Sequence, residues 1–306
     1  MQSDTISRVL LVTDGLLLGE FWCPPHSERW HSLNSVSAEP HVIFPRTPVT
    51  IRQLGREPAI CDRNQIVFYN PGQRFFRSLR SRTGDHCYYV ELSPELMRRL
   101  AGGSTSFPFS AGPSDASVFL LQRLAVRQLK EPEPDLELVE RALSLALETA
   151  IERGRRFHEL RAEQRESTRT AQREIVDHTR VILDARFRER LRMAEVANSL
   201  DVSRFQLSRF FRSHTGFSLL EYRNQLRVRA ALDRLPDSET RLSTLAAELG
   251  FSNPSHLTAA FRESFGVLPS ELRGRIDGRT LSAAIDRHAA TTNVRLSAPV
   301  GAASSL

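Results

Sequence analysis

Residues 191–273 constrain the fold of this chain more than any other stretch, because they carry the pattern of two short helices joined by a tight turn. Ser203, followed three residues later by Gln206, forms a capping box and predicts that a helix starts at residue 204. Three apolar residues share one face of this helix at 3- and 4-residue spacing: Leu207, Phe210 and Phe211. Residues 193–200 predict a short helix just before it. Two helices in this arrangement are typical of a helix-turn-helix.

The same pattern repeats about fifty residues further along the chain. Residues 242–251 predict the first helix of a second unit, and Pro254 fits the first position of the next helix, where a missing N–H costs nothing. Ser252 or Asn253 caps that helix. We align Phe210 of the first unit with Phe261 of the second, and we predict two helix-turn-helix units in tandem.

A connecting helix separates the two units. Ser218 and Glu221 form a further capping box, which opens a helix that ends near Leu235. Its core stripe is Leu219, Tyr222, Leu226 and Ala230 or Ala231. This helix is expected to hold the units at a fixed distance. Two reading helices on one face of DNA must lie about one turn apart, ~34 Å.

The residues that close each unit resemble the signature of the AraC/XylS family of transcription regulators. The first unit closes with Phe211-Arg212-Ser213-His214-Thr215-Gly216-Phe217-Ser218. The second carries Gly250-Phe251-Ser252-Asn253, Phe261-Arg262, Phe265-Gly266 and Pro269. The resemblance covers residues 191–273 and implies a regulator that binds double-stranded DNA. Two positions depart from the family pattern: Leu272 replaces an aromatic residue, and Ala259 replaces a residue that is commonly basic.

The second helix of each unit, 204–212 and 254–264, is predicted to read the major groove. The residues predicted to contact base edges are Phe205, Ser208, Arg209, Ser255, His256 and Thr258. Those predicted to contact the DNA backbone are Arg204, Arg212 and Arg262. Arg209 suits the O6 and N7 acceptors of guanine, and Phe205 suits a thymine methyl group, unless Phe205 is a core aromatic. The second reading helix bears short polar groups and is expected to position the protein more than it specifies sequence.

Residues 1–110 carry the pattern of short strands. Seven apolar runs are bounded by turn residues: 8–12, 16–23, 41–44, 49–54, 65–69, 75–79 and 87–92. Strands at this spacing predict a small antiparallel barrel or double sheet, and with the helical C-terminal half they give the fold class α+β. The family resemblance implies that this part is a cupin-like jelly roll, residues 1–110, that senses a small-molecule effector.

A cupin-type metalloenzyme fused to a DNA-binding domain is the alternative function. Cupin metal sites cluster His and Glu on adjacent strands, whereas the histidines of this region are scattered: His26, His31, His41 and His86. The sequence also lacks a nucleophile-elbow motif and a phosphate-cradling glycine loop. We therefore predict no metal, no cofactor and no enzymatic activity. The aromatic residues of the strands either fill the core or line an apolar pocket.

Residues 111–170 predict two helices followed by a polar segment. Five residues of the second helix have the spacing of a coiled-coil seam: Leu136, Val139, Leu143, Ala146 and Ala150. Packing on the barrel or on the same helix of a second subunit would bury this seam, and the family resemblance implies a homodimer here. Residues 152–173 predict a solvated helix or a flexible linker. The DNA-binding domain then spans 171–276, and 277–306 are expected to form a disordered tail.

Composition agrees with a DNA-binding protein without establishing one. The 306-residue chain has a net charge of +6, and Lys130 is its only lysine, so the basic residues are nearly all arginine. Arginine suits guanine and phosphate contacts, although we take a genome rich in arginine codons to be the larger cause of the bias. Cys23, Cys61 and Cys87 lack zinc spacing and are predicted to be reduced and buried. No stretch approaches the ~20 apolar residues that span a bilayer, so a cytoplasmic protein is predicted, with RNA polymerase as a further candidate partner.

Overall fold

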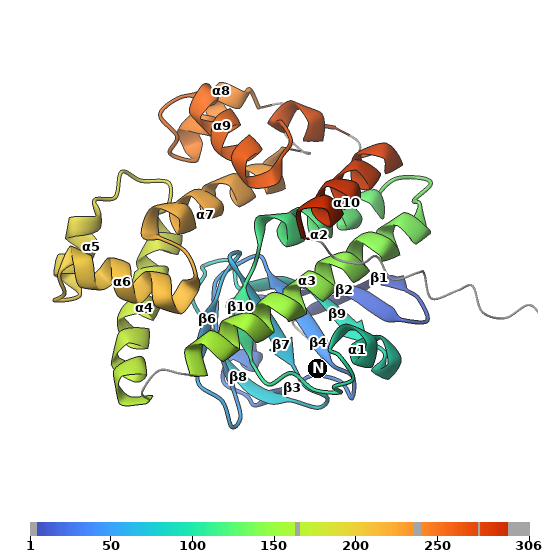
Figure 1. Cartoon of the computed structure of the whole chain (residues 1–306), viewed down its shortest axis with the longest axis horizontal. Coiled ribbons are helices and arrows are strands. Elements are labelled where there is room, and N and C mark those ends of the chain that lie inside the picture. The colour runs from blue at the N-terminus through green and yellow to red at the C-terminus, as the bar shows by residue number, and fades with distance from the viewer. Residues whose placement is uncertain (1–4, 163–165, 236–239, 275, 293–306) are drawn as a thin grey trace, which may run out of the picture.

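The computed structural model describes residues 5–162, 166–235, 240–274 and 276–292. Figure 1 shows a β-rich N-terminal half, in blue to green, and a helical C-terminal half, in yellow to red. The chain is therefore α+β, as its sequence predicts.

Two antiparallel sheets build the N-terminal half. The six-stranded sheet has the order β1 (Ile6–Val12), β2 (Leu16–Cys23), β9 (Asp85–Leu92), β4 (His41–Pro45), β7 (Gln65–Tyr69) and β10 (Ala111–Pro113). The four-stranded sheet has the order β3 (Asn34–Ser35), β8 (Arg74–Leu79), β5 (Val49–Gln53) and β6 (Ala59–Cys61). A short 3-10 helix, η1 (Glu28–Trp30), precedes β3. Side chains from both sheets share one core, so the sheets face each other.

All seven predicted strands are present, with ends that differ from the prediction by at most two residues. The sequence pattern did not reveal β3, β6 and β10, because strands of two or three residues are too short to show alternation. The three cysteines are buried and free, as predicted.

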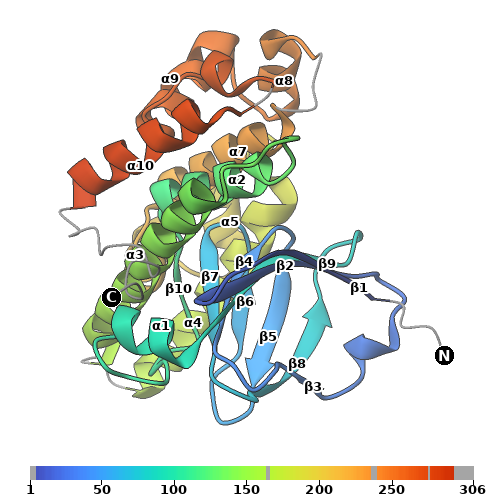
Figure 2. The same ribbon diagram turned by 90° about the vertical axis from the view of Figure 1, so that its right-hand side faces the viewer.

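Three helices follow the strands: α1 (Pro94–Leu100), α2 (Ala116–Gln128) and α3 (Leu136–Ala162). Every residue of α2 from Val118 to Gln128 is buried, because α3, α7 (Leu219–Arg234), α9 (Pro254–Phe265) and α10 (Gly278–Thr292) all contact it. Figure 2 shows α2 and α3 between the sheets and the layer of α9 and α10. Thr13, in the turn after β1, donates a hydrogen bond at 3.0 Å to Glu140 of α3. The middle helices thus join the two halves of the chain.

The predicted coiled-coil seam of α3 is buried by other parts of the same chain. Val139, Leu143, Ala146 and Ala150 are at most 1% exposed, and only Leu136 is half exposed. The elements that contact α3 are α2, the short strand β10, α10 and α1, so this face is covered within the chain, mainly by helices. The same residues are not available to a second subunit. The polar segment after residue 151 continues α3 to Ala162, which favours the solvated helix over the linker for this part.

The remaining helices of the C-terminal half are α4 (Glu166–Arg186), α5 (Met193–Ser199), α6 (Arg204–Thr215), α8 (Leu242–Glu248) and the 3-10 helix η2 (Pro269–Leu272). Thr179, Leu183 and Phe187 are buried. In the described ranges, no helix combines the length and the apolar character that crossing a membrane requires.

The expectation of a disordered tail over 277–306 is wrong for its first half. Residues Gly278–Thr292 form α10, whose buried positions Leu281, Ala284, Ile285 and His288 lie on one face against α2 and α3. The surrounding alanine, serine and threonine residues mask this 3- and 4-residue spacing in the sequence. Residues 293–306 lie outside the described part of the chain.

Candidate nucleic-acid interface

The first helix-turn-helix consists of α5 and α6. Ser203 caps α6 by accepting from the N–H of Gln206, and the Gln206 side chain accepts from the N–H of Ser203, so the predicted capping box is confirmed. Asp201, in the turn, has a φ of 53°, a left-handed conformation that asparagine and aspartate tolerate better than most residues. At the other end, Gly216 closes α6 with a φ of 79°. The turn and both ends of α6 are therefore fixed by local chemistry.

Every predicted contact residue of α6 is exposed on one side of the helix: Arg204, Phe205, Ser208, Arg209 and Arg212. The opposite side carries Leu207, Phe210 and Phe211, which are 0%, 9% and 0% exposed. Phe205 is 76% exposed, so the alternative that it is a core aromatic is wrong. An aromatic side chain left in water beside three arginines is the arrangement expected of a surface that meets bases and phosphates.

The second unit, α8 and α9, repeats the first with one extra residue in its turn: α8 begins 49 residues after α5. The helix α9 begins at Pro254, is capped by Asn253 and ends at Gly266, which places it 50 residues after α6. Phe211, rather than Phe210, is then the counterpart of Phe261, since both are fully buried at the same helical position. The alignment of Phe210 with Phe261 is wrong by one residue, because two adjacent phenylalanines fit the sequence pattern equally well.

The exposed face of α9 differs chemically from that of α6. Ser255, His256 and Arg262 are exposed, whereas Thr258 is only partly exposed. His256 is already engaged: its backbone N–H donates to Asn253 Oδ1 at 2.8 Å, and its Nδ1 lies 3.0 Å from Ser252 Oγ. Ala259 occupies the position that Arg209 holds on α6 and is also exposed. The second unit thus offers fewer groups that can discriminate between bases.

One pair of basic residues was missed by the sequence patterns. Arg192 and Arg241 are the N-cap residues of α5 and α8, and both are exposed. Neither makes a side-chain capping hydrogen bond. The 49-residue repeat of the first helix of each unit is the signal that would have paired them.

The helix α7 holds both units. Arg227 donates to the carbonyl oxygen of Phe187 at 2.6 Å and so fixes the chain between α4 and α5. Gln225 donates to Ser264 Oγ of α9 at 3.2 Å. The Ser218–Glu221 capping box at its start is present as predicted, and the predicted core stripe of α7 is buried. The distance between the reading helices is therefore set by one rigid element.

The same helix docks the DNA-binding half onto the rest of the chain through Asp233. This buried carboxylate pairs with Arg46 at 3.1 Å, Arg63 at 3.5 Å and Arg123 at 2.9 Å. Burial opposes ionisation of Asp233, but the three guanidinium groups outweigh it and lower its pKa.

A second docking contact surrounds Tyr222 in the middle of α7. Its hydroxyl donates to Asp62 Oδ2 at 2.6 Å, and its carbonyl oxygen accepts from Asn64 Nδ2 at 3.0 Å. Arg229, which is fully buried, donates to the carbonyl oxygens of Arg63 and Ser114. The helix that spaces the two reading helices is thus bonded directly to the edge of the β-sheet half.

The alternative of a metalloenzyme finds no ligand set in the part of the chain that the structure describes. There, no three His, Cys, Asp or Glu side chains are grouped so that they could hold a metal ion. His41 pairs with Glu91 at 3.3 Å, and His86 pairs with Glu20 at 2.8 Å. His26 and His31 are exposed.

Comparison with known proteins identifies the C-terminal domain. Residues 196–275 match the family model described as Helix-turn-helix domain. The chain is 31% identical over 91 residues to the HTH-type transcriptional activator RhaS of Pectobacterium carotovorum, which covers 30% of this chain and 33% of that protein. It is 26% identical over 185 residues to RhaS of Escherichia fergusonii, covering 59% of this chain and 66% of that protein. The chain thus spans less than two thirds of the length of each of these relatives.

One solved structure is also similar in sequence to this part of the chain. The C-terminal domain of AraT, a response regulator from Geobacillus stearothermophilus, is 26% identical, with a TM-score of 0.31, and covers 32% of this chain and 82% of that domain. These matches fall on the tandem units, so residues 196–275 are a helix-turn-helix domain similar to those of HTH-type transcriptional activators.

Proposed function

We propose that this chain is a sequence-specific DNA-binding transcription regulator of the AraC/XylS type, which contacts double-stranded DNA through α6 and α9. The observation that carries the proposal is the exposed face of α6. There, Phe205 and Arg209 lie beside further arginines on a helix whose turn and caps are those of a helix-turn-helix. Such a face can enter the major groove and contact both phosphates and base edges.

The two reading helices have different roles in this proposal. On α6, Phe205, Ser208 and Arg209 contact base edges, and Arg204 and Arg212 contact phosphates. On α9, the base contacts are Ser255, His256 and Thr258, and Arg262 contacts the backbone. Arg192 and Arg241, at the matching N-caps, add one phosphate contact to each unit. Because Ala259 replaces an arginine, α9 positions the protein and α6 supplies most of the specificity.

The β-sheet half acts as the sensor. It is a cupin-like domain over residues 1–110 and controls DNA binding through a small-molecule effector held between its sheets. Residues 111–170 form the helical connector, and 171–276 form the DNA-binding domain. The regulator acts as a homodimer on two half-sites, with a dimer contact outside the seam of α3, and RNA polymerase is its further partner.

Selection of bound sequences from random duplex DNA, at two salt concentrations, tests this function. The expected result is a motif with two elements about one helical turn apart, ~10 base pairs. Binding that depends on salt but enriches no sequence would contradict the proposal, because phosphate contacts alone give that behaviour.

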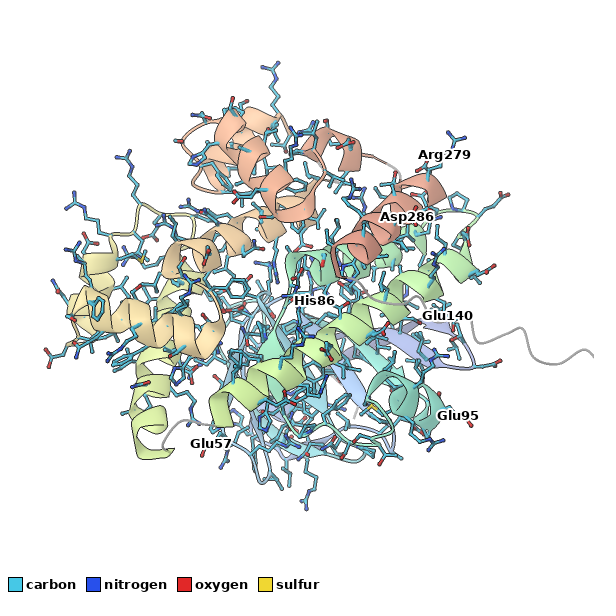
Figure 3. All side chains as sticks on the ribbon, in the orientation of Figure 1. Glu57, His86, Glu95, Glu140, Arg279 and Asp286 are labelled. Carbon is cyan, nitrogen blue, oxygen red and sulfur yellow. The ribbon has the colours of Figure 1, made fainter. Side chains whose placement is uncertain are left out.

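Replacing Arg209 by alanine tests the main base contact. We expect a loss of about 1–3 kcal/mol in operator binding and relaxed preference at one base pair, because the bidentate contact with guanine is lost. Fluorescence anisotropy with the selected operator and its single-base variants measures both effects. Arg279→Ala is the matched control, since Arg279 is exposed on α10, on the other side of the molecule from α6 in Figure 3. Equal losses for the two variants would contradict the role of Arg209.

Replacing Arg212 by alanine separates phosphate contact from base contact. This variant should bind all duplexes more weakly by a similar factor, without a change in preferred sequence. The slope of log K against log salt should become less steep by about 1, because one fewer counterion is released. A change in sequence preference would instead make Arg212 a base contact.

A further inference from the structure

The end of α2 holds the end of the second helix-turn-helix unit. Arg127, in the last turn of α2, is 8% exposed; its Nη1 donates to the carbonyl oxygen of Leu272 at 3.0 Å and its Nη2 to that of Gly274 at 2.6 Å. Glu131, just past the end of α2, accepts from the N–H of Ile276 at 3.2 Å. Hydrogen bonds donated by a charged group are about twice as strong as those between neutral groups. The chain that leaves the second unit is therefore fixed to α2.

The helix α10 adds an apolar attachment outside the helix-turn-helix units. It begins after residue 275, where the match to the helix-turn-helix family model ends. Figure 1 shows α10, in red, against α2 and α3, and its side chains Leu281, Ala284 and Ile285 are at most 4% exposed. Arg287 of α10 donates to the carbonyl oxygen of Gly266, the residue that ends α9, at 3.2 Å. The reading helix α9 is thus joined through α10 to the connector helices.

The helix α2 holds α7 as well as the second unit. Arg123, one turn before Arg127 on α2, pairs with Asp233 of α7 at 2.9 Å. Residues four apart lie on the same face of a helix, so one face of α2 binds both partners. Arg234, next to Asp233, pairs directly with Glu248 of α8, but these side chains are 39% and 46% exposed, and water screens such a pair. The buried contacts of α2 therefore contribute more to the orientation of the second unit than this exposed pair does.

The orientation of the second unit decides which DNA sites both units can bind at once. Each base pair turns the duplex by about 35°, so a rotation of α9 relative to α6 changes the spacing at which both helices meet the major groove. A loosely held unit accepts several spacings but loses affinity at the best one, because its orientation must be fixed on binding.

We propose that Arg127 is a positioning residue for DNA binding: together with α10, it fixes the orientation of α9 relative to α6 and so sets the spacing of the two DNA elements that the chain accepts. This inference rests on the proposed function. It adds the N-terminal half, acting through α2, to the parts of the chain that select an operator.

Operators with altered spacing test the proposal. Three duplexes are compared by fluorescence anisotropy with the full-length protein: the selected operator, the same operator with two base pairs inserted between its elements, and a duplex that keeps only the element contacted by α6. The insertion turns the elements by about 70° relative to each other. The wild type should therefore bind the extended operator at least about tenfold more weakly than the selected one.

The Arg127→Met variant should reduce this preference to about threefold or less. Methionine has no N–H donor for the two carbonyl oxygens, so the second unit can rotate to meet the extended operator. Affinity for the selected operator should fall, and affinity for the single α6 element should stay unchanged. Lys130→Met is the matched control, since it removes the same charge from an exposed position three residues away and should keep the wild-type preference. Arg287→Met, also at an exposed position, should reduce the preference by a smaller factor.

Two results would overturn the proposal. The first is a wild-type spacing preference in Arg127→Met. The second is an equal loss of affinity for all three duplexes in Arg127→Met together with an unchanged preference in Arg287→Met, because Arg127 then acts on stability alone.

The wild-type measurements keep this inference apart from the proposed function. If the selection enriches no sequence, the proposed function fails, and the positioning role fails with it. If the selection recovers two elements but the wild type binds the selected and extended operators equally well, only the positioning role is contradicted.

Discussion

The Asp233→Ala variant is expected to lose about 3–5 kcal/mol in the free energy of unfolding, which is the largest effect of any substitution considered for this chain. Asp233 is the only carboxylate that the structure pairs with Arg46, Arg63 and Arg123 in the described residues, and its side chain is only 8% exposed. Its removal leaves three cations close together without their counter-ion. Burial already lowers the pKa of Arg46, and the neighbouring charge of Arg123 lowers it further.

Urea denaturation followed by circular dichroism measures this loss. The matched control is Asp286→Ala, which removes the same charge from an exposed position on α10 (Figure 3) and should change the stability by less than about 0.5 kcal/mol. A loss for Asp233→Ala no larger than that of the control would contradict the role of Asp233. Because Asp233 lies on α7, the same variant is also expected to loosen the attachment of the two reading helices to the β-sheet half.

Local patterns predicted the elements whose conformation is decided by neighbouring residues. The capping boxes at Ser203 and Ser218, together with Pro254 at the start of α9, place helix ends correctly because each involves groups within three residues of one another. The buried face of α6 follows from apolar residues at 3- and 4-residue spacing. The exposed face is the opposite side of the helix, so it could be predicted as well. The base and backbone contacts assigned to that face stay predictions.

Contacts between distant residues could not be predicted in this way. A fully buried arginine such as Arg229 contradicts the usual preference of arginine for the surface, and its partners Arg63 and Ser114 lie more than a hundred residues away. The seam of α3 was identified correctly as an apolar face, but spacing does not state whether the chain itself or a second subunit covers it. The helix α10 was missed because its apolar face is narrow and becomes favourable only against α2 and α3.

The last expected effect concerns Asp184 of α4, whose carboxylate is partly buried near Asp62. Burial raises the pKa of Asp184 from its usual 3.8 to about 7, and the negative charge of Asp62 adds to the rise, while Arg63 and Arg188 oppose it. The carboxyl group of Asp184 is therefore still protonated in the folded chain at pH values where it has lost its proton in the unfolded chain. The corresponding contribution to stability is present below pH 3.8 and is lost as the pH rises through about 7.

Asparagine cannot ionise, so Asp184→Asn removes the free-energy cost of a charged carboxylate at this partly buried position. A shift of this size corresponds to at most about 4 kcal/mol, and solvent screening of the partly exposed side chain reduces it to about 2 kcal/mol. We expect Asp184→Asn to be more stable than the wild type by that amount at pH 8 and equal to it at pH 4, as measured by urea denaturation at both values. Asp286→Asn, at an exposed position, should show no such pH-dependent difference. If Asp184→Asn and the wild type instead change in stability in parallel between pH 4 and pH 8, Asp184 does not take up a proton in this range.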